Sequence, residues 1–504
     1  MLASVTTFAI SGLEPRRVTV EVDIRPGLPA FRVVGLGDAA VREARERVRA
    51  ALLNSGFEFP MRRITANLAP ASLRKIGPGF DLALAVGVLC ASGQVPVEAL
   101  EDQVVFGELG LGGDVRSCNG TLAVAEGARR HGLRRLVLAP PRAREAALVE
   151  GLEVAPAESL RDVAAVLGGA PAPPLPPRVD PPEPLAGPDL SDVRGQAAAV
   201  LAVEIAAAGA HNILLEGPPG TGKTMLARRV PSILPPLSPA EALEVTRIHS
   251  IAGLHRGEAL IRERPFRAPH HTISPSGLVG GGAPPAPGEA TFAHLGVLFL
   301  DELAEFSRSA LEALRQPLED GLVGIVRAQR AIVFPTACML VAAANPCPCG
   351  YGGDSRRCRC TAGELARYRR RLSGPLLDRI DLIVPVEAPT AAELRGPAGT
   401  SSAAVRERVL AARERQEHRL GEGGANARMT SRQVRSLARL SDPAQAHLMR
   451  HYAAAHLSAR GYQRAIRVAR TVADLAGRER IEGDDMLTAL GFRQVGAGDV
   501  VMAA

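Results

Sequence analysis

Tryptophan is absent from this 504-residue chain, and aromatic residues make up only 3% of it. Hydrophobic residues still reach 46%, so any buried cores must be largely aliphatic. Lysine occurs only at Lys75 and Lys223, and arginine supplies the rest of the 60 basic residues. The longest apolar run, residues 82–91, is too short to cross a bilayer, so no membrane partner is expected.

Cysteine is also scarce, with seven residues, four of them within fourteen positions, which does not resemble a secreted disulfide framework. No basic segment precedes an apolar run at the start of the chain, so a signal peptide is not indicated and a cytoplasmic protein is expected. The net charge of +7 and the pI near 9.3 favour a polyanionic partner, with nucleic acid the first candidate.

Length and composition predict about three domains. Residues 1–168 combine alternating apolar runs with helical spacing, which indicates an α/β or α+β domain. Residues 169–190 are rich in proline and predict an extended linker. Residues 191–389 carry strands that end in polar residues, and residues 390–504 have helical apolar spacing throughout. The fold class expected is therefore α/β with a helical C-terminal domain.

The apolar run 212–215 leads into a glycine-rich loop, and helical spacing follows the loop. This strand–loop–helix context is what a phosphate-binding loop requires, because its backbone N–H groups and the helix N-terminus both face the anion. Lys223 would reach the β- and γ-phosphates, and the Thr224 hydroxyl would bind Mg²⁺. The ATP-binding residues expected here are Gly217, Pro218, Pro219, Gly220, Thr221, Gly222, Lys223 and Thr224.

Further polar residues follow later apolar runs of the same domain. Asp301 and Glu302 end the run 296–300, where Asp301 would bind Mg²⁺ and Glu302 would polarise the attacking water. Asn345 ends the run 339–344 and can orient the same water. Arg379 precedes the strand 382–386 and is expected to act in a neighbouring subunit.

These motifs, in this order, resemble an AAA+ ATPase. Longer segments narrow the resemblance to the magnesium-chelatase-like AAA+ proteins of bacteria known as the YifB/ComM family. The segments that carry it are Arg264–Ser274, Gly288–His294, Asn345–Gly350, Leu376–Asp381, Ser458–Arg460 and Arg467–Thr471, and the resemblance covers essentially the whole chain.

The resemblance implies a homo-hexameric ring that uses ATP and Mg²⁺, with an AAA+ core and a C-terminal helical lid. It places the arginine finger at Arg379 and the sensor arginine at Arg460. It also implies ATP-driven helicase or branch-migration activity on single-stranded or branched DNA, in recombination or natural transformation. A chelatase-like or MoxR-like ATPase that remodels a protein complex is the competing interpretation.

In this family an insert and a hairpin lie on either side of the Asp-Glu pair, and related rings use such loops to grip DNA. The resemblance places the insert near residues 272–288 and the hairpin at 322–333, with Arg327 and Arg330 near its tip. His270 and His271 are further DNA-binding candidates, although a structural role suits them better, since adjacent side chains of an extended segment face opposite ways. Exposed basic turns without a ligand remain the alternative.

The first domain resembles the Lon protease catalytic domain, but it departs from the active pattern. Gly79 occupies the position of the nucleophile, and Leu122 stands where the catalytic lysine is expected. A Ser–Lys dyad needs both partners, so an inactive domain is predicted. Ser72 and Lys75 precede the loop and do not restore the dyad.

The four clustered cysteines are Cys347, Cys349, Cys358 and Cys360, referred to below as the cysteine cluster. Two close pairs joined by a glycine-rich turn can supply the four thiolates that Zn²⁺ prefers. One-residue spacing is less usual for zinc than two to four, so reduced structural thiols and a redox couple stay open beside the favoured zinc site. A permanent disulfide is disfavoured in a reducing compartment.

Overall fold

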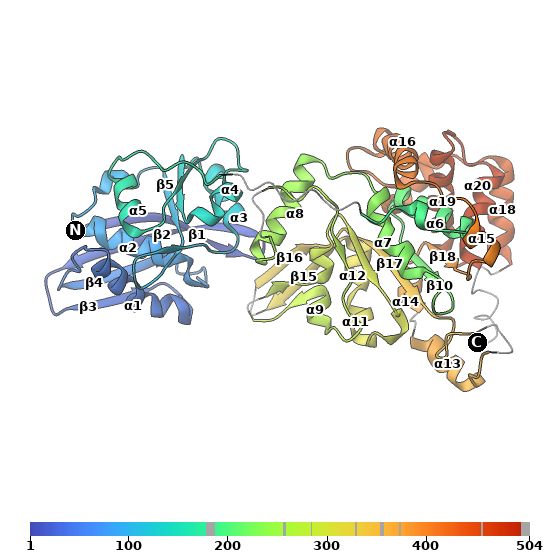
Figure 1. Ribbon diagram of the computed structural model, residues 1–504, viewed down its shortest axis with the longest axis horizontal. Helices are drawn as coiled ribbons and strands as arrows, with labels where there is room; N and C mark the ends of the chain where they lie inside the picture. Colours follow the sequence, from blue (N-terminus) through green and yellow to red (C-terminus); the bar gives the residue numbers. More distant parts are fainter. Residues whose placement is uncertain are drawn as a thin grey trace. The chain divides into compact units, whose positions relative to one another are not determined.

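The computed structural model describes residues 1–177, 187–255, 259–283, 285–327, 330–352, 357–371, 374–454 and 457–494 (Figure 1). The chain divides into two compact units. Unit 1 comprises Met1–Glu183 together with Ala242–Ile261, and unit 2 comprises Pro184–Glu241 together with Arg262–Ala504. The chain therefore leaves unit 2 at residue 242 and re-enters it at 262, a return that local sequence patterns did not predict. No helix of the described residues is long and apolar enough to cross a membrane.

Unit 1 is built on a seven-stranded mixed sheet with the order β3-β4-β2-β1-β5-β8-β9. Alternate residues of β2 are buried, as expected of a strand that packs one face on a core. The helix α2 is buried at every position and packs on β1 and β2. The strands are β1 (Leu2–Ser11), β2 (Glu14–Arg25), β3 (Ala30–Val34), β4 (Arg63–Ala69), β5 (Gln103–Phe106), β8 (Arg135–Leu138) and β9 (Glu153–Pro156), with a small hairpin of β6 (Glu108–Leu109) and β7 (Val115–Arg116). The helices are α1 (Ala39–Asn54), α2 (Asp81–Ala91), α3 (Thr121–Arg130), α4 (Ala143–Ala146) and α5 (Leu160–Leu167).

Unit 1 also contains most of α8 (Pro239–Ile251), which follows the phosphate-loop helix in the chain. The buried carboxylate of Glu145 joins this segment to the rest of unit 1. It accepts hydrogen bonds from the Leu122 N–H at 3.0 Å, from Arg142 at 2.6 Å and from the Ser250 hydroxyl. A carboxylate that is fully buried requires such partners, so this cluster fixes α8 within unit 1.

Unit 2 contains a five-stranded parallel sheet with the order β11-β14-β17-β10-β18. Side chains along its central strands alternate between two cores, as the strand period of two requires. In β17, Val341 packs into one core and Leu340 into the other. The strands are β10 (Ile213–Glu216), β11 (Phe266–Arg267), β14 (Val297–Leu300), β17 (Met339–Ala344) and β18 (Leu382–Pro385).

One core lies between the sheet and a helical layer that includes the C-terminal helices, so the predicted α/β architecture with a helical C-terminal region is confirmed. The helices of this layer are α6 (Ala197–Gly209), α7 (Lys223–Ile233), α16 (Ser402–Leu420), α17 (Ser431–Leu437), α18 (Asp442–Ala453), α19 (Ala459–Leu475) and α20 (Gly483–Gln494). The other core includes residues of α9 (Pro275–Val279), α10 (Glu289–Phe292), α11 (Arg308–Ala313) and α14 (Gly374–Leu377).

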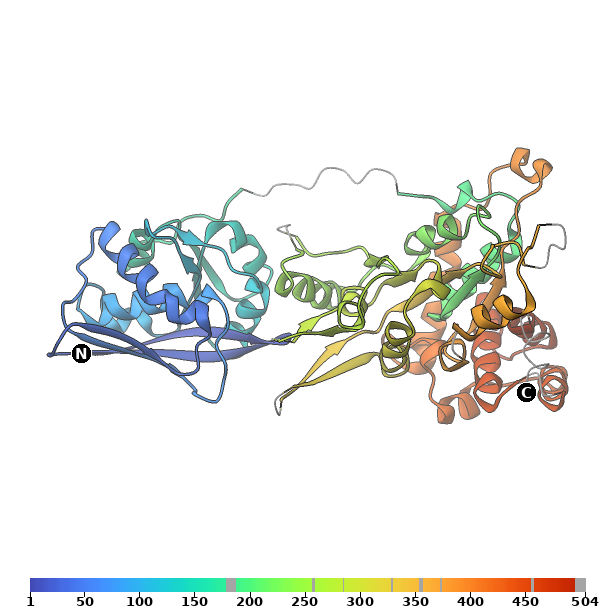
Figure 2. The ribbon, with the colours of Figure 1, turned by 90° about the horizontal axis from the view of Figure 1, so that it is seen from below.

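The predicted hairpin is present, formed by β15 (Leu322–Arg327) and β16 (Arg330–Pro335) after α12 (Arg315–Asp320). Its antiparallel register pairs Leu322 with Pro335 and Arg327 with Arg330. Figure 2 shows the hairpin projecting from the rest of unit 2. The insert predicted near residues 272–288 forms α9 and the short strands β12 (Gly280–Gly281) and β13 (Ala286–Pro287).

Candidate nucleotide site

Three neighbouring strands of the parallel sheet bring the predicted site residues together. The phosphate loop follows β10, Asn345 follows β17, and Asp301 and Glu302 follow β14. The sheet order places β17 between β10 and β14, so the carboxyl ends of all three strands meet at one edge. Ligands of open α/β sheets bind at this edge.

Glycine is required in the phosphate loop for two separate reasons. A Cβ at Gly217 would lie 2.1 Å from the carbonyl oxygen of Val386, so no side chain fits there. Gly220 and Gly222 have φ of +79° and +91°, a left-handed conformation that disfavours other residues. The Thr221 hydroxyl donates to the Pro218 carbonyl at 3.0 Å and closes the turn. The helix α7 begins at Lys223, so its N-terminus faces the loop.

Lys223 is buried within this loop. Its ammonium group donates to the carbonyls of Gly217 at 2.7 Å and Pro218 at 2.8 Å, and to the Asn345 side-chain oxygen at 3.2 Å. Burial lowers the pKa of Lys223, and the negative charges of Asp301 and Glu302 oppose that shift. The contact with Asn345 links the loop to the end of β17, as expected if both face one ligand.

Thr224 and Asp301 form a direct contact across 77 residues of sequence, because the Thr224 hydroxyl donates to Asp301 Oδ2 at 2.8 Å. A hydroxyl and a carboxylate oxygen at this separation suit Mg²⁺, which takes hard oxygen ligands and keeps several of its waters. The residues present therefore fit the expected Mg²⁺ site.

Glu302 has a left-handed backbone conformation, with φ of +51°. Such a conformation is uncommon outside glycine, and it clusters at functional sites. The Glu302 carboxylate lies 3.3 Å from Nδ1 of His271, whose ring lies tilted against that of His270 with centroids 4.1 Å apart. The structure thus places His271 against the expected catalytic carboxylate, while His270 is exposed and contacts the Thr272 hydroxyl at 3.0 Å.

Gln196 also contacts the phosphate loop. Its amide nitrogen donates to the Thr221 carbonyl of the phosphate loop and to the Glu387 carbonyl. Gln196 is the N-cap residue of α6 and ends the stretch 193–196, which is expected to lie beside the adenine in nucleotide-binding domains of this kind. Its contacts brace the outer side of the loop.

Arg379 lies just beyond α14, and it is buried within its own chain. Its side chain pairs with Glu319 and donates from Nε to the Arg315 carbonyl at 3.2 Å. The Arg379 carbonyl in turn accepts from the Asn212 amide at 2.9 Å. A role in a neighbouring subunit therefore remains a prediction, and it would require Arg379 to exchange these partners.

The sensor candidate Arg460 is the second residue of α19 and is exposed. One turn further along, Arg464 contacts the buried carboxylate of Asp381 at 2.8 Å. His211 contacts the other oxygen of Asp381 at 3.3 Å and the Thr471 hydroxyl at 2.8 Å. Burial opposes ionisation of Asp381, but His211 and two arginines outweigh it and hold the pKa well below its usual range. This network ties α19 to the segment that carries Arg379.

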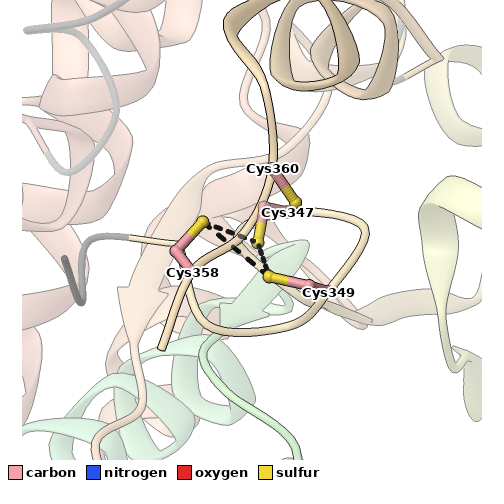
Figure 3. Close-up of side chains that lie close together, drawn as sticks. All are labelled: Cys347, Cys349, Cys358 and Cys360. Carbon is pink, nitrogen blue, oxygen red and sulfur yellow. Dashed lines mark hydrogen bonds between the residues drawn. The ribbon is translucent and has the colours of Figure 1, made fainter. Parts of the chain in front are cut away.

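The cysteine cluster directly follows Asn345 (Figure 3). All four Sγ atoms lie within 4.8 Å of one another, and the separations among Cys347, Cys349 and Cys358 are 3.3, 3.7 and 3.9 Å. Four sulfurs bound tetrahedrally to zinc at about 2.3 Å would lie about 3.8 Å apart. The backbone N–H groups of Tyr351 and Arg359 lower the pKa of Cys349 to about 6. The cluster could therefore hold a thiophilic metal ion.

For two of the residues expected to bind DNA, the structure describes only the backbone. Arg327 and Arg330 pair with each other in the hairpin backbone, and their side chains lie outside the described part of the structure. Their role as DNA contacts stays a prediction.

Comparisons with known protein families cover most of the chain. Residues 189–394 match the family "Magnesium chelatase, subunit ChlI", which is the region of the parallel sheet and the phosphate loop. Residues 20–142 match "Subunit ChlI of Mg-chelatase", and residues 399–493 match "Magnesium chelatase, subunit ChlI C-terminal".

Individual relatives match nearly end to end. An uncharacterized protein of Mycobacterium tuberculosis is 46% identical over 495 residues, which cover 97% of this chain and 98% of the relative. The uncharacterized protein YifB of Escherichia coli and the competence protein ComM of Haemophilus influenzae are each 42% identical, and each alignment covers 98% of this chain and 97% of the relative. With the phosphate loop, the parallel sheet and the helical C-terminal region in place, this chain belongs to the YifB/ComM family of magnesium-chelatase-like AAA+ proteins.

Proposed function

We propose that this protein is an ATP-driven motor that acts on DNA as a homo-hexamer, with helicase or branch-migration activity. The observation that carries the proposal is the meeting of Lys223, the Thr224–Asp301 pair, Glu302 and Asn345 at three adjacent strand ends. Each of these side chains has the chemistry that hydrolysis of a nucleoside triphosphate needs, and all face one edge of the sheet.

The role proposed for each residue follows from the chemical group of its side chain. Lys223 supplies a compact positive charge beside the loop amides for the β- and γ-phosphates. Thr224 and Asp301 would hold Mg²⁺, which neutralises charge on the phosphate oxygens when bound. Glu302 accepts a proton from water and Asn345 orients that water, while the contact between Asn345 and Lys223 keeps the two groups in one site.

The proposed ring supplies the remaining positive charges. Arg379 would reach the γ-phosphate of a neighbouring subunit once it leaves Glu319, and Arg460 would contact the nucleotide of its own subunit from α19. The contact between Arg464 and Asp381 supports this arrangement, because it joins α19, which carries Arg460, to the segment that carries Arg379. Arg379 of one subunit would stabilise the negative charge that develops on the γ-phosphate of the next. This interaction would favour closed interfaces between subunits.

DNA is the proposed substrate because of three features. The chain carries a net charge of +7, the projecting hairpin places Arg327 opposite Arg330, and ComM of Haemophilus influenzae is named a competence protein. Arginines on a projecting β-ribbon can bind phosphates without reading sequence, as a motor that travels along DNA must.

The first domain is proposed to be Lon-like and without protease activity. A Cβ at Gly79 would lie 2.8 Å from the Phe106 ring, so a nucleophilic side chain does not fit there. Leu122 is fully buried at the start of α3 and carries no amine. These two positions leave no Ser–Lys pair of the kind that such proteases use.

The cysteine cluster is proposed to hold Zn²⁺, since four thiolates suit this ion and all four Sγ atoms lie within 4.8 Å of one another. The proposed function as a whole is tested by ATP hydrolysis and strand-displacement assays with forked, three-strand and four-way DNA. We expect hydrolysis to rise with DNA and strands to separate only with ATP. Hydrolysis that no DNA stimulates, with no strand separation, would favour a remodelling ATPase that acts on a protein complex.

A further inference from the structure

The loop of the cysteine cluster touches the phosphate loop. Gly350 follows Cys349 and has φ of +85°, and its amide donates to the Cys347 carbonyl at 2.9 Å. A Cβ at Gly350 would lie 2.7 Å from both Cγ and Cδ of Pro219. The backbone of the cluster therefore lies directly against the proline at the centre of the phosphate loop, with no room for a side chain between them.

A second contact runs from the other side of the cluster. Cys360 leads into α13 (Ala362–Arg371), which Thr361 caps through its contacts with Glu364. On this helix, buried Tyr368 donates its hydroxyl hydrogen to the backbone carbonyl of Asn345 at 2.9 Å. Asn345 is the residue whose side chain accepts from Lys223. The two ends of the cluster thus reach two different parts of the nucleotide site.

We infer that a thiophilic divalent metal ion in the cysteine cluster sets the shape of the nucleotide site, so that nucleotide affinity depends on its occupancy. The inference rests on the proposed ATP site. A bound ion would join Cys347 and Cys349 to Cys358 and Cys360, and would thereby hold Gly350 against Pro219 and Tyr368 against Asn345. Without the ion, weak thiol contacts such as those of Cys347 and Cys349 with Cys358 join the two cysteine pairs.

The physical reason is that metal binding supplies folding free energy locally. The ion closes an eleven-residue separation between Cys347 and Cys358, and in its absence that ordering costs loop entropy that weak thiol contacts do not offset. Cys347 is fully buried, so its displacement would also disturb the end of β17. If the cysteine cluster beside it is mobile, the phosphate loop becomes ordered only when nucleotide binds. The free energy needed for that ordering lowers the affinity for nucleotide.

The first experiment measures metal content and nucleotide affinity in the same full-length preparation. Protein purified without chelator should contain one zinc ion per chain by elemental analysis. Removal of zinc with a zinc-selective chelator, with Mg²⁺ restored afterwards, should raise the Kd for a fluorescent ADP analogue about tenfold or more, and added Zn²⁺ should reverse the change. Unchanged affinity in fully zinc-free protein overturns the inference, as does the absence of metal from the purified protein.

A variant tests the contact between Gly350 and Pro219 independently of the metal. Gly350→Ala should keep its zinc and still weaken ADP-analogue binding several-fold, because the new methyl group displaces Pro219. Gly421→Ala is the matched control, since Gly421 has a similar left-handed φ of +94° but its Cβ would meet nothing within 4 Å, and it should change neither quantity. Normal affinity in Gly350→Ala that retains zinc contradicts the inference. Failure of the proposed ATP site itself would look different, because zinc-loaded protein would then bind the analogue no better than its Lys223→Ala variant.

Discussion

Nδ1 of His271 lies 3.3 Å from a carboxylate oxygen of Glu302, the residue proposed to activate water. The two residues come from different strand ends, since His271 follows β11 and Glu302 follows β14, which are neighbours in the sheet. A carboxylate oxygen that is paired with an imidazole is less available to accept a proton from water. The contact with His271 therefore holds the Glu302 carboxylate in a form that is less able to accept a proton from water.

Replacement of His271 tests this restraint. We expect His271→Ala to raise basal ATP turnover up to about fivefold, because the Glu302 side chain is 54% exposed and exposed pairs contribute at most ~1 kcal/mol. The Kd for nucleotide should not change, since the phosphates are proposed to bind at the loop. His270→Ala is the control and should leave turnover near that of the parent. A fall in turnover for His271→Ala would show that His271 supports Glu302 instead.

Lys223 and Glu302 should fail differently when replaced. Lys223→Ala is expected to lose nucleotide binding, because the loop keeps its amides but loses the charge that reaches the phosphates. Glu302→Gln should bind ATP normally and hydrolyse it about a hundredfold or more slowly, since only the proton acceptor is removed. Equilibrium binding and single-turnover hydrolysis distinguish the two. Near-normal turnover in Glu302→Gln would remove this residue from the mechanism.

Arg379 provides the test of sites shared between subunits. Arg379→Ala should reduce turnover about a thousandfold in the proposed ring. Mixing it with Lys223→Ala subunits should restore part of the activity, because some interfaces in mixed rings carry neither defect. Glu319→Gln is the control, as it removes the carboxylate charge that pairs with Arg379 within the chain and should leave Arg379 able to act. No recovery at any ratio, with mixed rings verified by mass spectrometry, would indicate a site within one chain.

The hairpin arginines should account for part of the salt dependence of DNA binding. In the double variant Arg327→Ala/Arg330→Ala, the slope of log K against log salt should flatten by ~0.7–0.9 for each phosphate that the hairpin no longer binds. Arg308→Ala is the matched control, because Arg308 is 82% exposed on α11 and its change should leave the slope unaltered. Parent-like binding and unwinding by the double variant would exclude the hairpin from DNA binding.

Asp381 should stabilise unit 2 in a pH-dependent manner. Because its folded-state pKa lies below the value of about 3.9 in an unfolded chain, its contribution is present above that value and is lost as the pH falls below it. Asp381→Asn should therefore lower the free energy of unfolding by about 3–5 kcal/mol at pH 7. The difference in unfolding free energy between variant and parent should shrink below about pH 4.

Tyrosine fluorescence can follow this unfolding, since the chain has no Trp and all four of its Tyr residues belong to unit 2. The control is Asp23→Asn, which removes an exposed ion pair with Arg25 in unit 1. It should leave the midpoint of the unfolding transition of unit 2 unchanged. A pH-independent difference for Asp381→Asn would mean that the hydrogen-bond geometry of this carboxylate, and not its charge, carries the stability.

Much of the site could be predicted because its residues sit at fixed offsets from apolar runs. The phosphate loop and Asp301 each follow a buried strand, and parallel strands of an α/β sheet all present their carboxyl ends at one edge. The hairpin was predicted at residues 322–333, and the structure extends it to Pro335. The place of Arg379 before the strand 382–386 predicted a role in a neighbouring subunit, and the family resemblance specified Arg379 as the arginine finger and Arg460 as the sensor arginine.

The contacts that modify the site could not be predicted in the same way. His271 against Glu302, Gln196 against Thr221 and Gly350 against Pro219 each join residues far apart in sequence. A single histidine, glutamine or glycine has no periodicity and many structural uses, so its partner is known only once the chain is folded. The same holds for residues 242–261, which lie inside the predicted second domain and yet pack into unit 1.

The sequence by itself determined the α/β class, the phosphate loop and the set of side chains available for phosphate and metal chemistry, because glycine conformation, strand period and ligand chemistry are local properties. Tertiary structure alone decided that the cysteine cluster touches the phosphate loop, that Glu302 is paired and that Arg379 is held by Glu319. Those relationships depend on strand order and on the packing of side chains between neighbouring strand ends, which are fixed by the whole chain and not by any segment of it.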